Sequence, residues 1–383
     1  MLKLKRIFTT AALLLAAVVV LGQNKSAGIN LSLWKGLQTQ PINEKQTTYF
    51  NLGLISAQNR THGLSLNIIG NNTNKDNKGI QVSGVYSIYK GSNYGLSLAG
   101  LFSLFSDDTY GLLIGGLGQV SAENSKGVSL AGLFNITGID DYGLSIGGVG
   151  NFTGYNTNGI YLAGLINYAG DEQRGLQIAG LTNIARYSKG VQIGATNIAR
   201  IELAGLQVGL FNYAPYGKGV QIGLVNFSKR FRGAQIGLVN LTPTTKYKVM
   251  LYGGNQTKVN AAIRFQNKLF YNQIGLGSPA LKWGDRFSGA ISYRTGIRYN
   301  LLPIWEISGD IGVQHINTFS NKDKANGIPR RMYSLQARVN NSVHLFHNIG
   351  AIMSVGYGTT RWYSKSETYR KGIIVEAGLY YQL

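Results

Sequence analysis

A short repeat decides the fold of this chain, and one clear copy of it reads Gly127-Val128-Ser129-Leu130-Ala131-Gly132-Leu133-Phe134-Asn135. The pattern is glycine, apolar, polar, apolar, small, glycine, apolar, any residue and asparagine. Copies begin at Gly63, Gly79, Gly95, Gly111, Gly127, Gly143, Gly159, Gly175, Gly190, Gly205, Gly219 and Gly233. The spacing is 16 residues up to Gly175 and then shortens to 15 and finally to 14 residues. A constant short period of this kind is typical of a protein built from stacked or sequential repeats.

Each copy has the pattern of a β-strand followed by a turn. Apolar Val220, Ile222 and Leu224 alternate with Gln221 and Gly223, which is the period of two expected for a strand. Turn-forming residues fill the connecting segments, as in 140–142 and 214–218. A helix is not expected, because glycine recurs every few residues and each glycine would cost a helix about 0.5–1 kcal/mol.

The shortening of the repeat suggests a local change in the strand. Early copies contain a small residue followed by glycine, such as Ala131-Gly132, whereas late copies contain the single glycine Gly223. We interpret the early pair as a β-bulge with its glycine in the left-handed conformation. Under that hypothesis Leu133 and Leu224 face the same side of the sheet.

The repeats contain no charge where a solvated strand would carry one. The nine residues that start at each of the twelve glycines include no Asp, Glu, Lys or Arg. A sheet with one face in water normally places charges on that face, and a charge facing the middle of a bilayer costs about 2–4 kcal/mol. The pattern therefore favours lipid on one side of the strands and a tightly packed or Gly/Gln/Ser-lined interior on the other.

Longer alternating strands replace the repeats from about Lys246 onward. In the segment 287–301 the residues of one face are Phe287, Gly289, Ile291, Tyr293, Ile297, Tyr299 and Leu301, and those of the other are Ser288, Ser292, Arg294, Arg298 and Asn300. The segment from Trp305 to Gln314 repeats this alternation, and further strands are expected in 333–339, 349–359 and 373–383. Apolar-out, polar-in alternation is typical of an outer-membrane β-barrel.

Six charged residues then share the inner face of this C-terminal region. They are Arg294, Arg298, Glu306, Asp310, Arg338 and Glu376. Unlike charges among them are able to pair across neighbouring strands. The set either lines a pore or gate, or packs a polar lumen, and the second interpretation is the one we favour.

Composition and charge agree with a lipid-facing β-protein. The chain has 383 residues with 52 glycines, 23 tyrosines and 14% charged residues, and the lack of cysteine excludes a disulfide framework and thiol chemistry. The net charge is +21, or +18 without the leader residues Lys3, Lys5 and Arg6. The cations either lie in solvated turns, which is the interpretation we favour, or contact an anionic surface such as lipopolysaccharide phosphates. Nucleic acid is not expected as a partner, because the cations lie mostly in turns, as in 74–78 and 229–232, without interleaved aromatic residues.

Both ends of the chain carry the features of an exported outer-membrane protein. Residues 1–6 are basic and residues 7–21 are apolar, which predicts a signal peptide over 1–22 with cleavage before Gln23. That apolar run is short for a transmembrane helix, and no later stretch approaches 18 apolar residues. The C-terminal Gly378, Tyr381 and Leu383 resemble the signal read by the barrel-assembly machinery, although Leu383 replaces a terminal aromatic residue and Ala377 a polar one.

The clearest repeats resemble a group of bacterial proteins. The copies at 175–183, 205–212 and 233–240 look like those of surface-repeat proteins of Gram-negative bacteria, notably the Bacteroidota. The resemblance covers roughly residues 63–241. It implies an exported, outer-membrane or surface-associated protein, and it assigns no functional residue.

We found no pattern that indicates an enzyme or a cofactor. His344 and His347 are three residues apart, which on a strand gives poor metal geometry. The chain has no Gly-x-Ser-x-Gly elbow and no phosphate-binding loop that ends in Lys-Ser/Thr. The acidic pairs Asp107-Asp108 and Asp140-Asp141 are expected in turns, either solvated or holding calcium. We therefore predict a protein that is not an enzyme, and we assign no catalytic, cofactor-binding or metal-binding residue.

The sequence predicts an all-β chain with four segments: the signal peptide 1–22, N-terminal strands over 23–62, glycine-rich strand-turn repeats over 63–245 and C-terminal barrel strands over 246–383. Our main hypothesis is a single antiparallel outer-membrane β-barrel of about 22 strands, built largely from the repeats. The alternative is a β-solenoid of stacked repeats, with a ladder formed by Asn135, Asn151, Asn167 and Asn183, joined to a C-terminal barrel of about eight strands.

Each fold implies a role at the bacterial surface. The single barrel predicts a structural part or a passive pore, and the solenoid predicts a surface adhesion or scaffold module that its barrel anchors. In either case the expected partners are outer-membrane lipid, lipopolysaccharide and the barrel-assembly machinery.

Overall fold

The computed structural model describes residues 28–40, 42, 46–243, 245–267, 269–282, 286–321, 330–364 and 368–383. The signal peptide expected over 1–22 lies outside these residues. Contacts divide the chain into two compact units, Met1–Gly209 and Leu210–Leu383, and each is described by itself. In the described part of the chain, no helix has the length and apolar character needed to cross a membrane.

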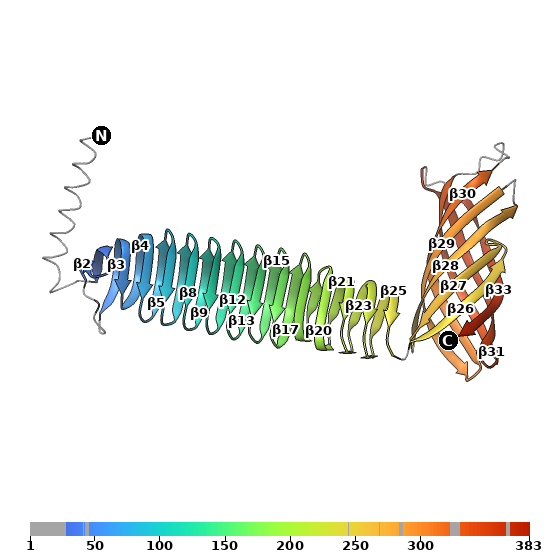
Figure 1. The fold of residues 1–383 in the computed structure, drawn as a ribbon, viewed down its shortest axis with the longest axis horizontal. Helices are drawn as coiled ribbons and strands as arrows, with labels where there is room; N and C mark the ends of the chain where they lie inside the picture. The colour runs from blue at the N-terminus through green and yellow to red at the C-terminus, as the bar shows by residue number, and fades with distance from the viewer. Residues whose placement is uncertain are drawn as a thin grey trace. The chain divides into compact units, whose positions relative to one another are not determined.

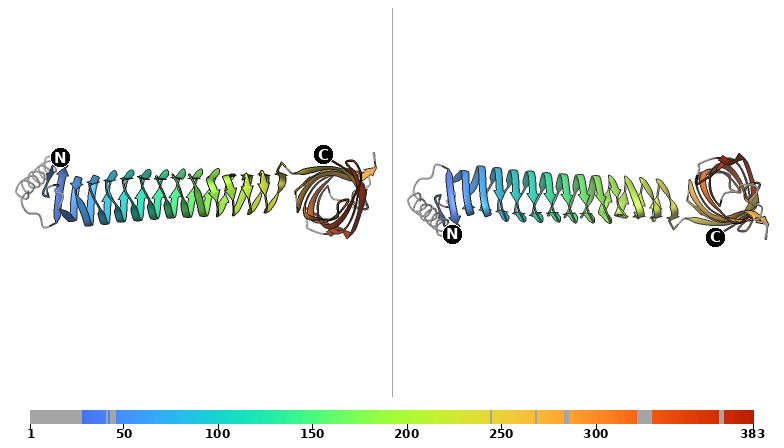
Figure 2. Two further views of the ribbon diagram at one scale, coloured as in Figure 1. Left: turned by 90° about the horizontal axis from the view of Figure 1, so that it is seen from below. Right: turned by 90° about the horizontal axis from the view of Figure 1, so that it is seen from above.

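The first unit is a parallel β-solenoid, seen in Figure 1 as stacked rungs. One rung consists of β11 (Ser125–Ala131), a tight turn, β12 (Phe134–Thr137) and a second turn. The strand β11 pairs in parallel with β9 (Thr109–Gly115) and β13 (Asp141–Gly147). In the same way β12 pairs with β10 (Gly118–Ser121) and β14 (Gly150–Thr153). Each rung thus adds one strand to each of two facing sheets (Figure 2).

The other strands of the first unit continue these two sheets. They are β1 (Ile29–Trp34), β2 (Leu37–Gln38), β3 (Thr47–Gln58), β4 (Arg60–Thr73), β5 (Asn77–Ser83), β6 (Tyr86–Tyr89), β7 (Asn93–Ala99), β8 (Phe102–Phe105), β15 (Thr157–Ala163), β16 (Ile166–Ala169), β17 (Glu172–Ala179), β18 (Thr182–Ser188), β19 (Val191–Ile193) and β20 (Thr196–Leu203), and β21 (Leu206–Tyr213) starts in this unit. The N-terminal segment expected to form strands, 23–62, contains β1, β2 and β3.

The main hypothesis of one antiparallel barrel is therefore wrong, and the solenoid alternative is correct. Pairing between successive repeats is parallel, and Gly127 lies beside Gly111 and Gly143, one repeat away on either side. Parallel stacking places equivalent positions of successive repeats side by side, so that equivalent residues on adjacent rungs make equivalent contacts. The estimate of 22 strands is also wrong, because each repeat supplies two strands.

The β-bulge hypothesis for Ala131-Gly132 is wrong as well. The strand β11 ends at Ala131, and Gly132-Leu133 form the turn to β12. Gly132 is not among the glycines with a positive φ angle. In the shorter late repeats, one continuous strand, β23 (Val220–Phe227), runs through the corresponding position at Gly223.

Another column of glycines fixes the close stacking of the rungs. Gly111, Gly127 and Gly143 have φ angles of +128°, +130° and +126°, which side chains rarely adopt. A Cβ atom added to Gly127 would overlap the carbonyl oxygen of Gly111. Glycine at the start of the copies from Gly63 to Gly175 is therefore required by both conformation and space.

The second unit contains late repeats and a closed antiparallel barrel. Its repeat strands are β22 (Tyr216–Gly217), β23, β24 (Arg230–Phe231) and β25 (Ala234–Leu241). The barrel strands are β26 (Lys246–Gly254), β27 (Val259–Gln266), β28 (Phe270–Lys282), β29 (Arg286–Leu302), β30 (Trp305–Asn321), β31 (Arg331–Phe346), β32 (Ile349–Trp362) and β33 (Thr368–Gln382). The pairing of β26 with β33 closes the ring, which Figure 2 shows end-on.

The barrel strands have the alternation that the sequence predicts. On β29, Ile291 and Ile297 are exposed, whereas Ser288, Ser292 and Arg294 are buried. The apolar side chains therefore face outward and the polar ones face the lumen.

Candidate functional site: barrel lumen and solenoid interior

Charged side chains fill the lumen of the barrel. A barrel of eight strands has an interior that its own side chains can fill or that can hold one small ligand. Five of the six predicted inner-face charges, all except Arg298, are buried, and Arg298 is partly buried. Lys248 on β26 and Arg264 on β27 join them, and both are buried. Sequence reasoning missed these two, although Val249 and Leu251 alternate with Lys248 and could have revealed the first.

Glu306 is the centre of one group of cations. Its Oε2 accepts hydrogen bonds from Arg298 Nε at 2.8 Å and from Lys248 Nζ at 3.3 Å. Arg264 Nη1 lies 3.7 Å from Oε1, and Gln266 Nε2 donates to Oε2 at 2.6 Å. One carboxylate thus joins side chains from β26, β27, β29 and β30.

Glu376 and Asp310 form a second level of the network. Arg294 Nη2 and Arg338 Nε lie 3.3 Å and 3.2 Å from Glu376 Oε2. Asp310 Oδ2 accepts hydrogen bonds from Tyr271 and Asn340, each at 2.7 Å. The predicted pairing of unlike charges is confirmed, and it joins strands across the lumen as well as neighbours.

Aromatic rings also contact two of these cations, Lys248 and Arg264. Lys248 Nζ lies 4.3 Å from the ring centre of Tyr380, and the Arg264 guanidinium lies 4.1 Å from that of Tyr271. Such cation–π contacts gain strength where water is excluded. The lumen is therefore bridged by a cross-linked network, which favours the packing interpretation over an open pore.

A polar pocket lies at one end of the barrel, beyond this network. Its lining includes Asn255, Gln314, Thr318, Thr360 and Arg370. On β30 the order Glu306, Asp310, Gln314, Thr318 leads from the charged network to this pocket. The network therefore separates the pocket from the opposite end of the barrel.

The interior of the solenoid is polar and is joined by side-chain ladders. In the first unit, the asparagine ladder runs from Asn135 through Asn151, Asn167 and Asn183 to Asn197, with Nδ2–Oδ1 distances of 2.8, 2.9, 3.0 and 2.9 Å. This confirms the ladder expected for the solenoid alternative. A glutamine ladder joins Gln177, Gln192 and Gln207 at 3.1 and 2.9 Å. In the second unit, Asn212, Asn226 and Asn240 are linked in the same way at 2.8 and 2.7 Å.

Asp141 is an acid inside the first unit. The expectation that it lies in a turn is wrong, because it opens β13 and points into the interior. Its Oδ2 accepts a hydrogen bond of 2.7 Å from Ser145 Oγ. Burial raises the pKa of this carboxyl from 3.8 to about 6. Neighbouring rungs carry neutral Ser125 and Thr157 at the same register position.

Replacing Asp141 with asparagine is expected to stabilise the solenoid at neutral pH. Because the pKa of Asp141 is higher in the folded state, its contribution is most favourable below about pH 4 and is lost as the pH rises through about 6. The shift corresponds to about 3 kcal/mol, so Asp141→Asn should raise the melting temperature at pH 7.5 and change it little at pH 4. The measurement is thermal unfolding of the full chain in detergent micelles, with Glu123→Gln as an exposed control. An equal effect of Asp141→Asn at both pH values would refute the assignment.

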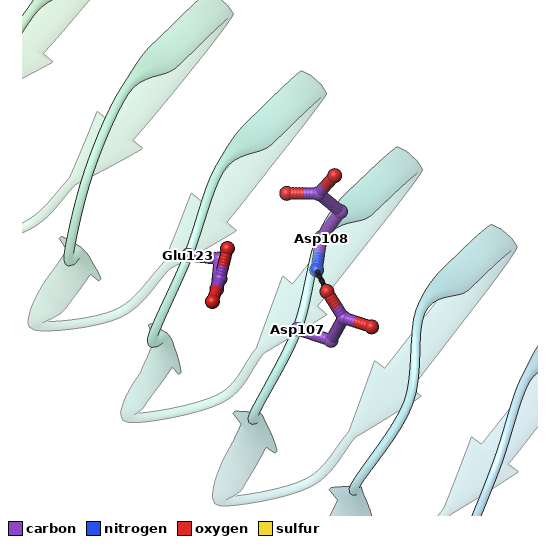
Figure 3. A group of neighbouring side chains, drawn as sticks. All are labelled: Asp107, Asp108 and Glu123. Atoms are coloured by element: carbon purple, nitrogen blue, oxygen red, sulfur yellow. Dashed lines mark hydrogen bonds between the residues drawn. The ribbon is translucent and has the colours of Figure 1, made fainter.

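Three acidic side chains lie together on the turns of the first unit. Asp107 and Asp108 belong to one turn and Glu123 to the next rung (Figure 3), and their carboxylates lie within 4.8 Å of one another. Asp108 Oδ1 accepts hydrogen bonds from the backbone N and Nδ2 of Asn124, at 3.2 and 2.9 Å, and Oδ2 accepts one from Tyr110. Burial opposes ionisation of Asp108, but these hydrogen bonds and Lys126 outweigh it and lower its pKa.

The hydrogen bonds of Asp108 are part of a further ladder along this edge. Asn156 donates to Asp140 as Asn124 donates to Asp108, and the backbone N–H groups of Asp140 and Glu172 donate to Asn124 and Asn156. The carboxylates of Asp108 and Asp140 therefore have a structural role in ordering the turns.

The comparisons with known proteins leave the family of the chain open. No family model matches it, and no curated protein is significantly similar to it.

Proposed function

We propose that this chain is a surface scaffold protein of a Gram-negative outer membrane, in which the C-terminal barrel is the anchor and the solenoid is the scaffold. The observation that carries the proposal is the polarity of the closed barrel, which is apolar outside and charged inside. Exposed fractions on its outer side reach 62% for Leu251, 66% for Ile311 and 62% for Val339. A ring of exposed apolar side chains around a closed barrel is stable in lipid and unfavourable in water.

Two further features support an anchoring role for the barrel. Its last strand, β33, contains the Gly378 and Tyr381 of the sequence that resembles the barrel-assembly signal. The bridges made by Glu306 and Glu376 fix the lumen, which suits an anchor better than a passive pore. We infer outer-membrane lipid, lipopolysaccharide and the assembly machinery as partners, and no enzymatic activity.

The stacked repeats support the scaffold role. A solenoid extends by adding equivalent rungs, and repeat proteins of this kind use the resulting long surfaces for binding. An adhesion function would use the same surface.

An arginine at the middle of the lipid-facing wall is expected to prevent stable insertion. Val339 lies midway along β31, between its register partners Gly309 and Val355. Val339→Arg should cost about 2–4 kcal/mol, and Leu345→Arg, near the end of the same strand, about 0–1 kcal/mol. The measurement is the fraction of full-length protein recovered in purified outer membranes and its resistance to denaturant after reconstitution.

Equal behaviour of the two variants would contradict a barrel that crosses lipid. So would recovery of the unchanged chain in the soluble periplasmic fraction.

A further inference from the structure

The first unit reverses the usual distribution of polar and apolar residues in a water-soluble protein. Ser145 and Asn151 are buried in its interior, whereas Leu133, Ile146 and Ile160 are 39%, 37% and 45% exposed. Hydrogen-bonded ladders stabilise the interior, so the apolar side chains are left on the outer faces of both sheets. Exposed apolar surface that continues over many rungs indicates a binding surface.

The two edges of this solenoid differ in polarity. The turns between the longer and the shorter strand of each rung, here called the apolar edge, present Val85, Leu101, Leu117, Leu133, Val149, Leu165 and Leu181. The turns on the opposite side, here called the polar edge, carry Asp107, Glu123, Asp140 and Asp171 among others. The apolar surface of the unit therefore consists of two faces and one edge.

Backbone N–H groups at the apolar edge donate hydrogen bonds from rung to rung. The N–H of Leu133 donates to the carbonyl of Leu117 at 2.7 Å, that of Val149 to Leu133 at 2.8 Å, and that of Leu165 to Val149 at 2.9 Å. An unsatisfied backbone polar group costs several kcal/mol in hydrocarbon. These N–H groups are paired, so they do not add that cost when the edge lies in lipid.

Tyrosine and lysine side chains form a row near the polar edge. The rings of Tyr94 and Tyr110 stack at 4.9 Å, and Lys126 Nζ lies 5.2 Å and 5.6 Å from the ring centres of Tyr110 and Tyr142. These residues are register partners on successive rungs. Tyrosine and lysine favour the interface between lipid headgroups and acyl chains.

The apolar part is narrow enough to fit within one leaflet of a bilayer. On one rung it runs from Leu144, just past the row, to Val149 at the apolar edge. The strand part, from Leu144 to the end of β13 at Gly147, rises roughly 10 Å at about 3.3 Å per residue, and the turn with Val149 adds to it. Half of a hydrocarbon core of about 30 Å is roughly 15 Å.

We propose that the solenoid of the first unit is embedded in one leaflet of the bilayer, with the apolar edge toward the midplane and the polar edge among the headgroups. Lipid acyl chains can cover both faces and the edge, whereas a second copy would cover one face. The inference rests on the proposed function, because the barrel brings the chain to the membrane. The uncharged repeats predict contact with lipid. The proposal keeps this contact but places it on a solenoid instead of a barrel wall.

The test uses the full chain, which has no cysteine of its own. Single variants Leu133→Cys at the apolar edge, Glu123→Cys at the polar edge and Val339→Cys on the barrel wall are labelled with a small fluorophore. Each is reconstituted into vesicles of phosphatidylcholine and phosphatidylglycerol. Quenching by nitroxides on the acyl chains is compared with quenching by aqueous iodide.

The proposal expects acyl-chain nitroxides to quench the labels at residues 133 and 339 several-fold more than the label at 123, which iodide should quench. If the label at 339 is quenched by lipid and that at 133 by iodide, the inference fails while the barrel anchor stands. If iodide quenches both, the anchor fails as well. Shielding of residue 133 from both quenchers, with energy transfer between differently labelled copies, would assign the surface to self-association and overturn the proposal.

Discussion

Replacing Glu306 with alanine is expected to destabilise the barrel by about 3–5 kcal/mol, the cost of breaking a buried ion pair by removing one partner. The carboxylate of Glu306 is within 3.7 Å of Lys248, Arg264 and Arg298. Without it, three cations remain in a narrow lumen and repel one another. Urea unfolding of the full chain in phospholipid vesicles, followed by tryptophan fluorescence, measures the loss, which should lower the unfolding midpoint of the barrel.

Ser342→Ala is the matched control for this variant. Ser342 is buried in the same lumen, and its hydroxyl has no hydrogen-bond partner among the described residues. Its loss should change the free energy of unfolding by less than about 0.5 kcal/mol. If Glu306→Ala behaves like Ser342→Ala, the charge network does not stabilise the barrel.

The variant Asn151→Leu is expected to destabilise the solenoid by roughly 2–6 kcal/mol. Asn151 Nδ2 donates to Asn167 Oδ1 and to the carbonyl of Leu162, both at 2.9 Å. Leucine has a similar volume but leaves both acceptors buried without this donor, at roughly 1–3 kcal/mol each. Denaturant unfolding of the full chain in micelles, followed by circular dichroism, measures the change.

Asn158→Leu provides the comparison on the adjoining rung. Asn158 is exposed on the outer side of β15, so its replacement should alter stability by no more than about 0.5 kcal/mol. A larger effect at residue 158 than at residue 151 would show that the interior ladder is not the source of stability.

The sequence reveals the repeats and the facing of the barrel strands, because both depend on local periodicity. It does not separate parallel from antiparallel pairing, since alternation with period two looks the same in both. The asparagines at 135, 151 and 167 were the informative signal, because only parallel stacking aligns them. The turn at Gly132-Leu133 was missed since it has no polar turn residue and resembles the interior of a strand.

The sequence predicted only part of the candidate site, because it shows which face of a strand a side chain lies on but not which side chains meet across the lumen. Alternation on β29 and β30 placed Arg294 and Glu306 on the inner face, which the structure confirms. Which charges meet depends on closure of the barrel by β26 and β33, and this is a property of the tertiary fold. Lys248 and Arg264 contact Glu306 through that closure although they lie far from it in sequence.

Cross-linking between successive repeats tests the central claim, parallel stacking of the rungs, most directly. Tyr142 and Asn158 are register partners on the outer face of β13 and β15, about 4.8 Å apart as neighbouring strands are. Tyr168 lies on the outer side of the other sheet. If successive repeats formed an antiparallel hairpin, Tyr168 would lie opposite Tyr142. Parallel stacking predicts rapid disulfide formation in the full chain carrying Tyr142→Cys and Asn158→Cys, and none with Tyr142→Cys and Tyr168→Cys. Efficient bonding of the second pair in place of the first would contradict it.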